Sequence, residues 1–324
     1  MYARLATGYS VRSPTTDDIP SIIAVMRALD LAETGEPDVY EASDILADWA
    51  DLDPTTDVWV VCTPDGLLCG YATLATDGPS RLLADGYVHP DHTGHAIGTT
   101  LLALTEARAE AVVAALPEGT RQVLVNNIIA SSDAARALLE GRGYVLTRVY
   151  FRMHISLDAP PPPPEWPSGI SVRACDGSPE DIKRAYETVE ESFRDHWAHT
   201  PRSFEDWQAR MVGERFDPSL WFLAQSGDQI AGAALCRVRE LGKGWIRQVA
   251  VLRPWRQRGI GRALLQQAFG AFYARGVMRV GLGVDGQSLT GAQRLYERAG
   301  MQVTMRMGRY EKELRAGADC AEDA

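Results

Sequence analysis

The sequence predicts a mixed α/β fold (an α+β mixed sheet) built as two tandem domains, each a twisted mixed β-sheet flanked by helices. Three observations carry this prediction. With 324 residues the chain is long for one domain and natural for two. Five successive prolines, Pro160 to Pro164, interrupt it near the midpoint. The order of expected strands and helices before these prolines is repeated after them.

We therefore expect domains at residues 1–157 and 170–314, joined by a proline-rich linker at 158–169 and followed by an acidic tail at 315–324. Proline fixes φ and lacks an N–H group, so the run favours an extended polyproline conformation and cannot join a helix or a central strand. The alternative is a proline-rich loop inside one domain. The midpoint position and the restart of the pattern favour a linker.

The first copy is expected to begin with a strand and two helices and to continue with a hairpin. Thr16 can cap the first helix, because its side-chain oxygen can accept a first-turn N–H. Pro64, Asp65 and Gly66 supply the turn of the hairpin. The expected strands are 9–12, 58–62, 67–74, 81–88, 122–126 and 144–155, and the expected helices are 17–29, 41–50, one ending near 116, and 133–140.

The second copy repeats this order. Apolar residues recur at helical spacing after the glycines at 259 and 261, and Gly276 stands just beyond the expected end of that helix. The expected strands are 170–173, 220–225, 229–240, 244–251, 279–284 and 302–314. The expected helices are 178–193, 203–212, one from the glycines to 274, and 291–299.

Composition and charge limit the possible partners. A formal net charge of −10 argues against nucleic acid, because phosphate binding needs a basic face. The charge is compatible with a cationic or amine acceptor, although net charge cannot identify a substrate. The sequence has no run of 18 apolar residues and no apolar signal core. Five scattered cysteines indicate reduced thiols, so we expect a cytoplasmic protein without a membrane partner.

A glycine-containing basic loop carries the strongest chemical signal. The expected strand ends at Val251, the loop holds Arg256, Gly259 and Gly261, and a helix follows. A helix N-terminus presents N–H groups without acceptors and a partial positive charge. Glycines let a phosphate approach the backbone, and nearby arginines add positive charge. The pattern predicts a pyrophosphate site, with a simple tight turn as the alternative.

The spacing Arg256-x-x-Gly259-x-Gly261 resembles the R/Q-x-x-G-x-G/A acyl-CoA loop of the GNAT N-acetyltransferases. Neither the G-x-G-x-x-G dinucleotide pattern nor a Walker lysine is present. The resemblance covers nearly the whole chain and implies acetyl-CoA as the acyl donor, no metal, and strands that part below the loop to admit the pantetheine arm. The cofactor-binding residues that it implies are Val249, Ala250, Val251, Arg256, Gln257, Arg258, Gly259, Ile260, Gly261, Arg262 and Ser288.

Downstream, residues 291–301 resemble the A-x-x-L-Y-x-x-x-G-F segment of the same family. The family tyrosine lies near the acyl-CoA sulfur, so the resemblance implies that Tyr296 is the general acid that protonates the leaving thiolate. The alternative is a core residue, since Ala292, Leu295 and Ala299 share its helix face. Ser288 stands where the family often has asparagine, so the contact that this asparagine makes in the family is weaker or absent here.

In the first copy both features have decayed. Thr93, His95 and Ala96 occupy the positions of the second copy's two loop arginines and first glycine, and only Gly98 is retained. Leu139, which has no proton to give, occupies the tyrosine position. Alanine is tolerated in the family loop, so the first copy can still bind acyl-CoA. We expect its role to be structural rather than catalytic.

The acceptor is expected to meet residues between the first two helices of the second copy, which in the family form part of the acceptor wall. Those candidates are Glu191, Asp195, His196 and Trp197. His196-x-x-His199 has metal-ligand spacing but no evident third ligand, so we expect no metal. Strand 245–250 holds no carboxylate, which leaves the base open between a nearby acid and bulk water.

These expectations describe an acyl-CoA-dependent N-acyltransferase in which a small amine attacks the thioester directly, with acetyl as the expected acyl group. The two-copy layout resembles that of mycothiol-synthase-like enzymes, while aminoglycoside and amino-acid acceptors stay open. A monomer is expected, because the two copies can form a pseudo-dimer. The alternative from another class is a non-catalytic acyl-CoA-binding sensor or scaffold, which would need no proton donor.

Overall fold

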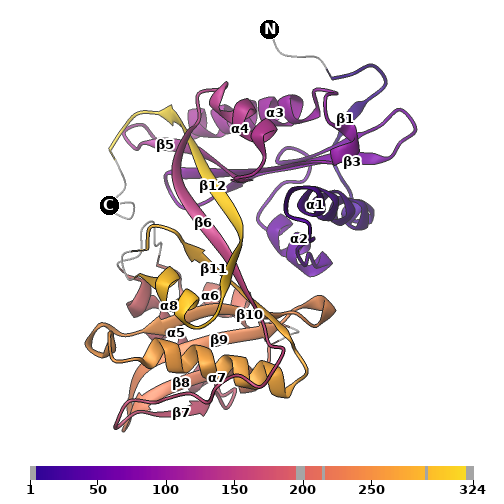
Figure 1. Ribbon diagram of the computed structural model, residues 1–324. Coiled ribbons are helices and arrows are strands. Elements are labelled where there is room, and N and C mark those ends of the chain that lie inside the picture. The colour runs from indigo at the N-terminus through magenta and orange to yellow at the C-terminus, as the bar shows by residue number, and fades with distance from the viewer. Residues whose placement is uncertain (1–4, 195–200, 214–215, 289–290, 319–324) are drawn as a thin grey trace. The chain divides into compact units, whose positions relative to one another are not determined.

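The computed structural model describes residues 5–194, 201–213, 216–288 and 291–318 (Figure 1). Its contacts divide the chain into two compact units. Within the described residues, the first unit contains the chain up to Val149 together with residues 305–318, and the second contains Tyr150–Thr304. Each unit is a mixed sheet with helices on both faces, so the predicted fold class is confirmed.

In the first unit the strand order is β1-β2-β3-β4-β5-β12, antiparallel except for the parallel β4–β5 pair. Helices α1 and α2 pack on one face and α3 and α4 on the other. The elements are β1 (Ser10–Arg12), α1 (Ile19–Thr34), α2 (Ala42–Trp49), β2 (Val58–Cys62), β3 (Leu68–Thr76), β4 (Arg81–Val88), α3 (Ile97–Ala115), β5 (Gln122–Ile129), α4 (Asp133–Glu140) and β12 (Gln302–Arg315).

In the second unit the order is β6-β11-β10-β9-β8-β7, with a single parallel pair, β10–β11. Helices α5 and α6 pack on one face and α7 and α8 on the other. The elements are β6 (Val145–Ser156), β7 (Ser171–Ala174), α5 (Pro179–Phe193), α6 (Phe204–Met211), β8 (Trp221–Ser226), β9 (Gln229–Val238), β10 (Gly244–Val251), α7 (Ile260–Ala274), β11 (Arg279–Asp285) and α8 (Ala292–Arg298).

The last strand of each sequence copy completes the other unit. In the second unit, β6 pairs with β11 from Tyr150 to Ser156, and in the first unit β12 pairs with β5 from Met307 to Arg315. The predicted boundaries at 1–157 and 170–314 divide the chain by repeat, whereas the compact units divide it by packing. The boundaries therefore stay a prediction about the repeats, and the exchanged strands are a feature that the sequence did not reveal.

Helix α7, which follows the glycine-containing loop, is held in place by packing on the sheet. Its apolar residues face β10 and β11, and Phe269 and Phe272 are buried there. Burying such a side chain contributes about 1.5–3 kcal/mol to folding. Gly244 gives Phe272 room, because a Cβ there would lie 2.9 Å from the ring. The helix that begins at the loop is thus fixed against the strand that ends there.

The proline run belongs to no helix or strand and is followed by an anchored segment. Trp166 and Ile170 pack against the core that α7 forms with the sheet. The linker is therefore packed against the second unit at its C-terminal end.

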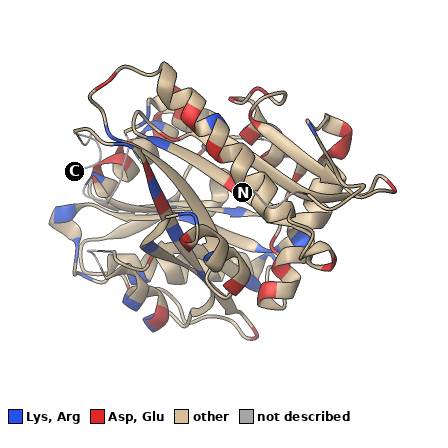
Figure 2. Cartoon of the chain, turned by 90° about the horizontal axis from the view of Figure 1, so that it is seen from above, with Lys and Arg blue, Asp and Glu red and all other residues tan. Residues whose placement is uncertain are grey.

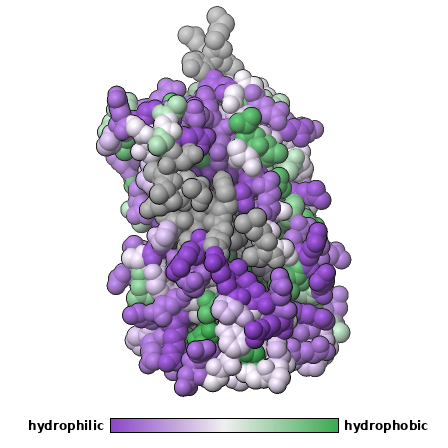
Figure 3. All heavy atoms as spheres, turned by 90° about the vertical axis from the view of Figure 1, so that its left-hand side faces the viewer, coloured by the Kyte–Doolittle hydropathy of each residue, from purple (hydrophilic) through white to green (hydrophobic). Residues whose placement is uncertain are grey.

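The surface is rich in polar residues and in charged residues of both signs, as expected for a chain of this composition. Acidic and basic residues are interspersed in the view of Figure 2, and most of the face drawn in Figure 3 is hydrophilic. Within the described residues, no helix combines the length and apolarity needed to cross a membrane.

Candidate functional site

The candidate site begins where β10 and β11 separate. Their parallel pairing covers only Gly244↔Val280 and Trp245↔Gly281, although β10 continues to Val251 and β11 to Asp285. β10 stays paired with β9 to its end, and β11 stays paired with β6. The parting of strands implied by the resemblance is therefore present below the loop.

The loop itself holds two residues in left-handed conformation. Gln257 has φ 62° and Gly259 has φ 89°, and Gly259 is the N-cap of α7. Gln257, Arg258, Gly259 and Arg262 are all exposed to solvent. Since the first turn of a helix has N–H groups without intrahelical acceptors, this end of α7 offers an accessible anion site.

Gly261 allows a close contact inside this site. A Cβ at Gly261 would lie 3.1 Å from Cδ2 of Leu295 in α8 and 3.7 Å from Cγ2 of Val251 in β10. The glycine therefore brings the first turn of α7 against both the strand end and the helix that carries Tyr296.

The loop arginines divide into two kinds. Arg256 donates from Nε to the Val251 carbonyl oxygen at 3.0 Å and from Nη2 to the Ser192 carbonyl oxygen at 2.9 Å. These bonds join the loop to the end of α5, so this guanidinium is engaged with protein backbone. Arg258 lies with its Cζ 5.0 Å from the centroid of the Trp255 ring, and Arg262 is exposed on the first turn of α7.

Tyr296 is buried in α8, with 8% of its surface exposed. Burial raises its pKa to about 12, because the phenolate loses hydration. The described residues supply no hydrogen-bond partner for its hydroxyl. Tyr296 is therefore a neutral phenol over the physiological pH range and can donate a proton.

The loop of the first unit keeps the backbone of the second. Gly94 has φ 83° and Ala96 has φ 60°, so glycine and non-glycine have exchanged places while both left-handed conformations persist. The segment before β1 contacts this loop: Ala6 N donates to His95 O at 3.2 Å, and the Tyr9 ring stacks on the His95 ring at 4.9 Å. Leu139 is buried at the tyrosine position.

Of the predicted acceptor residues, only Glu191 lies within the described residues. Glu191 lies in the last turn of α5 and forms an ion pair with Arg194. Asp195, His196 and Trp197 lie outside the described residues. Ser288 lies in the turn after β11, where its N–H donates to Asp285 O at 3.2 Å and its carbonyl accepts from Gly291 N at 3.2 Å.

Two polar residues near the parted strands were not among the predicted site residues. Asp285, the last residue of β11, is 6% exposed and accepts a hydrogen bond from Gln287 N at 3.0 Å. Gln248 lies in β10 beside a bulge, and its Oε1 is buried without a hydrogen-bond partner. The sequence did offer a signal for Asp285, because this acid directly follows the expected strand 279–284. The pairing of β10 and β11 ends before Asp285, so an acid at this strand end lies beside the parted strands.

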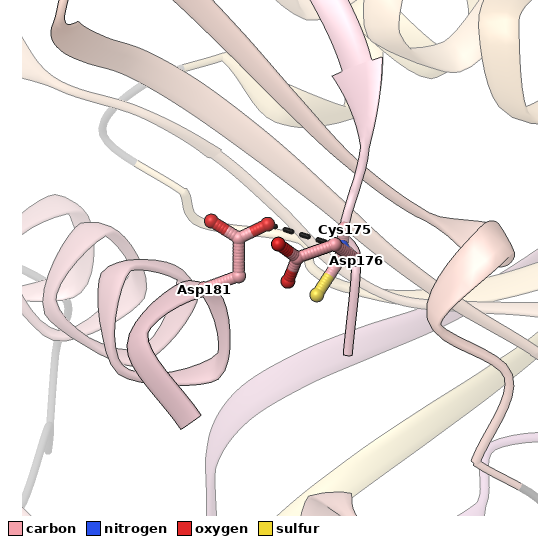
Figure 4. A group of neighbouring side chains, drawn as sticks. All are labelled: Cys175, Asp176 and Asp181. Carbon is pink, nitrogen blue, oxygen red and sulfur yellow. Dashed lines mark hydrogen bonds between the residues drawn. The ribbon is translucent and has the colours of Figure 1, made fainter. Parts of the chain in front are cut away.

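A possible cation site lies elsewhere, at the start of α5 (Figure 4). Ligand atoms of Cys175, Asp176 and Asp181 lie within 4.8 Å of one another. Both carboxylate oxygens of Asp181 are engaged by Arg173, the second at 2.7 Å, and Asp181 also accepts from Asp176 N at 3.0 Å. The cluster thus joins β7 to α5 through an ion pair.

A cavity in the first unit is also separate from the loops. It lies between the C-terminal part of α3 and the end of β12, lined by Glu110, Val113, Leu116 and Arg315 among others. None of its lining residues belongs to the first unit's loop, which precedes α3, or to the candidate site at the start of α7.

Comparison with known proteins gives matches over most of the chain. A model described as the Acetyltransferase (GNAT) family matches residues 23–144 and 182–301, one match in each sequence copy. A mycothiol acetyltransferase of Thermobispora bispora is 32% identical over 72% of this chain and 76% of its own length. Another from Frankia casuarinae is 30% identical over 75% of this chain and 71% of its own.

Solved structures agree with these matches. A GCN5-related N-acetyltransferase from Sphaerobacter thermophilus is 40% identical, with a TM-score of 0.85 over 98% of this chain and 99% of that one. A tandem GNAT protein from the clavulanic acid biosynthesis pathway has a TM-score of 0.70 at 16% identity, covering 96% of this chain and 100% of that one. The second likeness is one of fold alone.

Proposed function

Because the chain belongs to the GNAT acetyltransferase family, we propose that it is an acetyl-CoA-dependent N-acetyltransferase that acts on a small amine. One observation carries the proposal. Within the described residues, the second unit combines parted strands, an open helix N-terminus and the buried phenol of Tyr296. The first unit has a leucine in place of that phenol.

The residues of the loop fit the phosphates of a CoA molecule. Gln257 and Gly259 are exposed and left-handed, which leaves the start of α7 open to an anion. Arg258 and Arg262 would add positive charge, whereas Arg256 would hold the loop in shape. Val249, Ala250 and Val251 would border the pantetheine arm on β10, and Ser288 would lie beyond the end of β11.

When bound, acetyl-CoA supplies the thioester that the amine attacks. Tyr296 would donate its proton to the departing sulfur, and a phenol of raised pKa is a suitable donor because it stays protonated. The backbone N–H near Val251 would polarise the thioester carbonyl. The amine loses a proton as its bond to carbon forms, and either water or the Asp285 carboxylate would accept it.

The relatives suggest where to look for the acceptor. Several of them are mycothiol acetyltransferases, so amines related to mycothiol are the first to test. Glu191, Asp195, His196 and Trp197 remain our candidates for the acceptor wall.

We infer a cytoplasmic monomer. The four described cysteines are buried free thiols, as expected in a reducing compartment. The two sequence copies can form a pseudo-dimer within one chain, so no second chain is needed.

The direct test is release of free CoA from acetyl-CoA in the presence of a panel of amines. We expect turnover with at least one amine and none with the corresponding N-acetylated compound. Tight acetyl-CoA binding without turnover on any amine would instead identify a non-catalytic acyl-CoA sensor. Calorimetry of acetyl-CoA binding, run alongside, separates that result from an inactive preparation.

A further inference from the structure

The sheet of the first unit also has parted strands. The parallel pairing of β4 with β5 ends at Ala84↔Asn126, although both strands continue beyond it. β4 stays paired with β3 to its end at Val88. Asp85 is therefore the first residue of β4 that lies beyond the pairing with β5.

Asp85 carries a carboxylate with which no described residue forms a hydrogen bond or an ion pair. The residue is half-buried. Burial, with the like charge of Asp48 on α2 as the second cause, raises its pKa to about 6. No basic side chain in the described part of the chain acts against this rise. A carboxylate withdrawn from water without a compensating partner costs free energy, and a bound cation would offset that cost.

Two tyrosine rings lie on the same face of the sheet as Asp85. Tyr87 is two residues further along β4, so its side chain points to the same face at a spacing of about 7 Å. Tyr71 of β3 is its cross-strand partner, and the two rings stack with centroids 6.1 Å apart and planes at 20°. Trp49 of α2 donates from Nε1 to the Tyr71 hydroxyl at 2.9 Å, which fixes the buried ring of the pair.

Tyr87 is the ring of this pair that a ligand can reach, because it is half-buried whereas Tyr71 is buried. No described residue forms a hydrogen bond with its hydroxyl. Burial, followed by the charge of Asp85, raises the pKa of Tyr87 well above its ordinary value. The phenol therefore stays neutral, and the electron-rich face of such a ring attracts cations.

The second unit has neither the acid nor the ring. Counted from the ends of β4 and β10, Asp85 corresponds to Gln248 and Tyr87 to Ala250. Ala250 is buried in the core that α5 forms with the sheet. The first unit, in turn, has Leu139 where the second has its phenol. A cation held by the first unit would therefore meet no proton donor at that position.

We propose that the first unit binds a small organic cation, an amine in its ammonium form, between the carboxylate of Asp85 and the ring of Tyr87. The ammonium N–H groups donate to the carboxylate, and the cationic end lies against the ring face. This site is distinct from the acetyltransferase site proposed for the second unit and does not depend on turnover there. It gives the first copy, which the sequence predicts to be structural, a ligand of its own.

The test compares cations with neutral molecules of the same shape. The cations are butylamine, phenethylamine and glucosamine, and their partners are butan-1-ol, 2-phenylethanol and glucose, in which a hydroxyl group replaces the ammonium group. Calorimetry is run at pH 7, above the pKa of Asp85, and without acetyl-CoA, so that no turnover occurs. We expect at least one cation to bind about tenfold or more tightly than its neutral partner, because only the cation can form the ion pair.

Two substitutions then assign this binding to the site. Asp85→Asn should weaken binding of the cation by about 10- to 100-fold, the usual effect of losing a hydrogen bond to a charged group. Tyr87→Leu removes the ring face and should weaken it by about 2- to 30-fold. Asp228→Asn is the matched control, because Asp228 is an exposed acid in the turn between β8 and β9. It should bind the cation as the wild-type protein does.

A preference for the cation that is absent from all three pairs, or that is unchanged in Asp85→Asn, overturns the site. Thermal unfolding of the variants checks their folding and adds a second readout. At pH 7 the Tm of Asp85→Asn should equal or exceed that of wild type, because the amide removes a charge that burial disfavours. A Tm lower by several degrees would mean that the protein itself supplies a partner for the carboxylate, which also overturns the site.

Discussion

Tyr296 and Leu139 hold equivalent positions in two related helices, and the difference between them is one dissociable proton. We expect Tyr296→Phe to lower kcat about 10²- to 10⁴-fold, the usual contribution of a general acid, with little change in acetyl-CoA affinity. Steady-state kinetics and calorimetry measure the two quantities. Tyr273→Phe, on α7, is the control, and an unchanged kcat in Tyr296→Phe would remove the tyrosine from the mechanism.

The raised pKa of Tyr296 makes a further prediction for the pH profile. With a pKa of about 12 the phenol keeps its proton throughout the usual assay range. Its loss therefore causes no fall in rate below about pH 11. An alkaline fall at lower pH that is present in wild type and absent in Tyr296→Phe contradicts this assignment.

Substitution of the two loop arginines should have different effects, one on the stability of the protein and the other on its affinity for acetyl-CoA. Arg256→Gln removes charged donors from two backbone carbonyls, so we expect it to lower the free energy of unfolding by about 1–3 kcal/mol. Arg258→Gln should change stability by less than about 0.5 kcal/mol but weaken acetyl-CoA binding in a salt-dependent way. Urea unfolding and calorimetry measure both. The opposite assignment of effects would restore Arg256 as the phosphate ligand.

Asp181 should stabilise the second unit in a pH-dependent way. Hydrogen bonding from Arg173 lowers its pKa to about 2, so the charged form is favoured in the folded state. A lowered carboxyl pKa stabilises above the unfolded value near 4, and this stabilisation is lost as pH falls through about 2. Asp181→Asn should cost about 2 kcal/mol at pH 7 and progressively less between pH 4 and 2. A difference independent of pH would contradict the ion pair.

At the scale of elements, α7 offers two glycines with opposite expected responses. Gly259 has φ 89° and Gly270 lies in the helix interior, and no atom lies within 4 Å of either Cβ position. Gly259→Ala should destabilise by about 1 kcal/mol through backbone strain, whereas Gly270→Ala should stabilise by about 0.5–1 kcal/mol. Thermal or urea unfolding measures both. Equal effects would mean that the left-handed N-cap is not retained in solution.

Elements with strong local signals could be predicted from the sequence. Expected helix 178–193 appears as α5, Pro179–Phe193, and expected strand 244–251 is β10 without change. Helix 17–29 was wrong at both ends: α1 is Ile19–Thr34, because Thr16–Asp18 form a 3₁₀ turn and Gly35 ends the helix.

The exchange of β6 and β12 was equally hidden. The two strands follow helices at equivalent positions of the two copies, α4 and α8. Nothing local specifies which sheet each one joins, because that choice depends on pairing partners elsewhere in the chain. The parting of β10 and β11, by contrast, followed from the family resemblance of a short loop.

At the scale of the whole molecule, the exchanged strands predict that neither half folds alone. Cleavage at a protease site inserted within Pro160–Pro164 should leave the two fragments associated, because each contains a strand of the other unit. Size-exclusion chromatography of the cleaved protein measures this. Each fragment expressed separately should lack a cooperative unfolding transition, and co-expression should restore it.

An intact, cooperatively folding monomer of either fragment would contradict this prediction. A control site inserted in the hairpin turn at Gly227, which lies within the second unit between β8 and β9, should also be cleaved without dissociation. Association after cleavage is therefore expected at both sites. The contribution of the exchanged strands is tested by the separate expression of the two fragments that the linker site defines.

The position of β12 in the chain also sets an order of events during synthesis. The first unit is nearly complete once Val149 has left the ribosome, yet its last strand begins at residue 302. At usual translation rates of about 5–20 residues per second, strand β5 waits on the order of 10 s for its partner. Its edge, Gln122–Ile129, is largely apolar and would be open to pairing with other nascent chains during that interval. Chaperones would therefore encounter the nascent protein while the sheet of its first unit still lacks β12 beside β5.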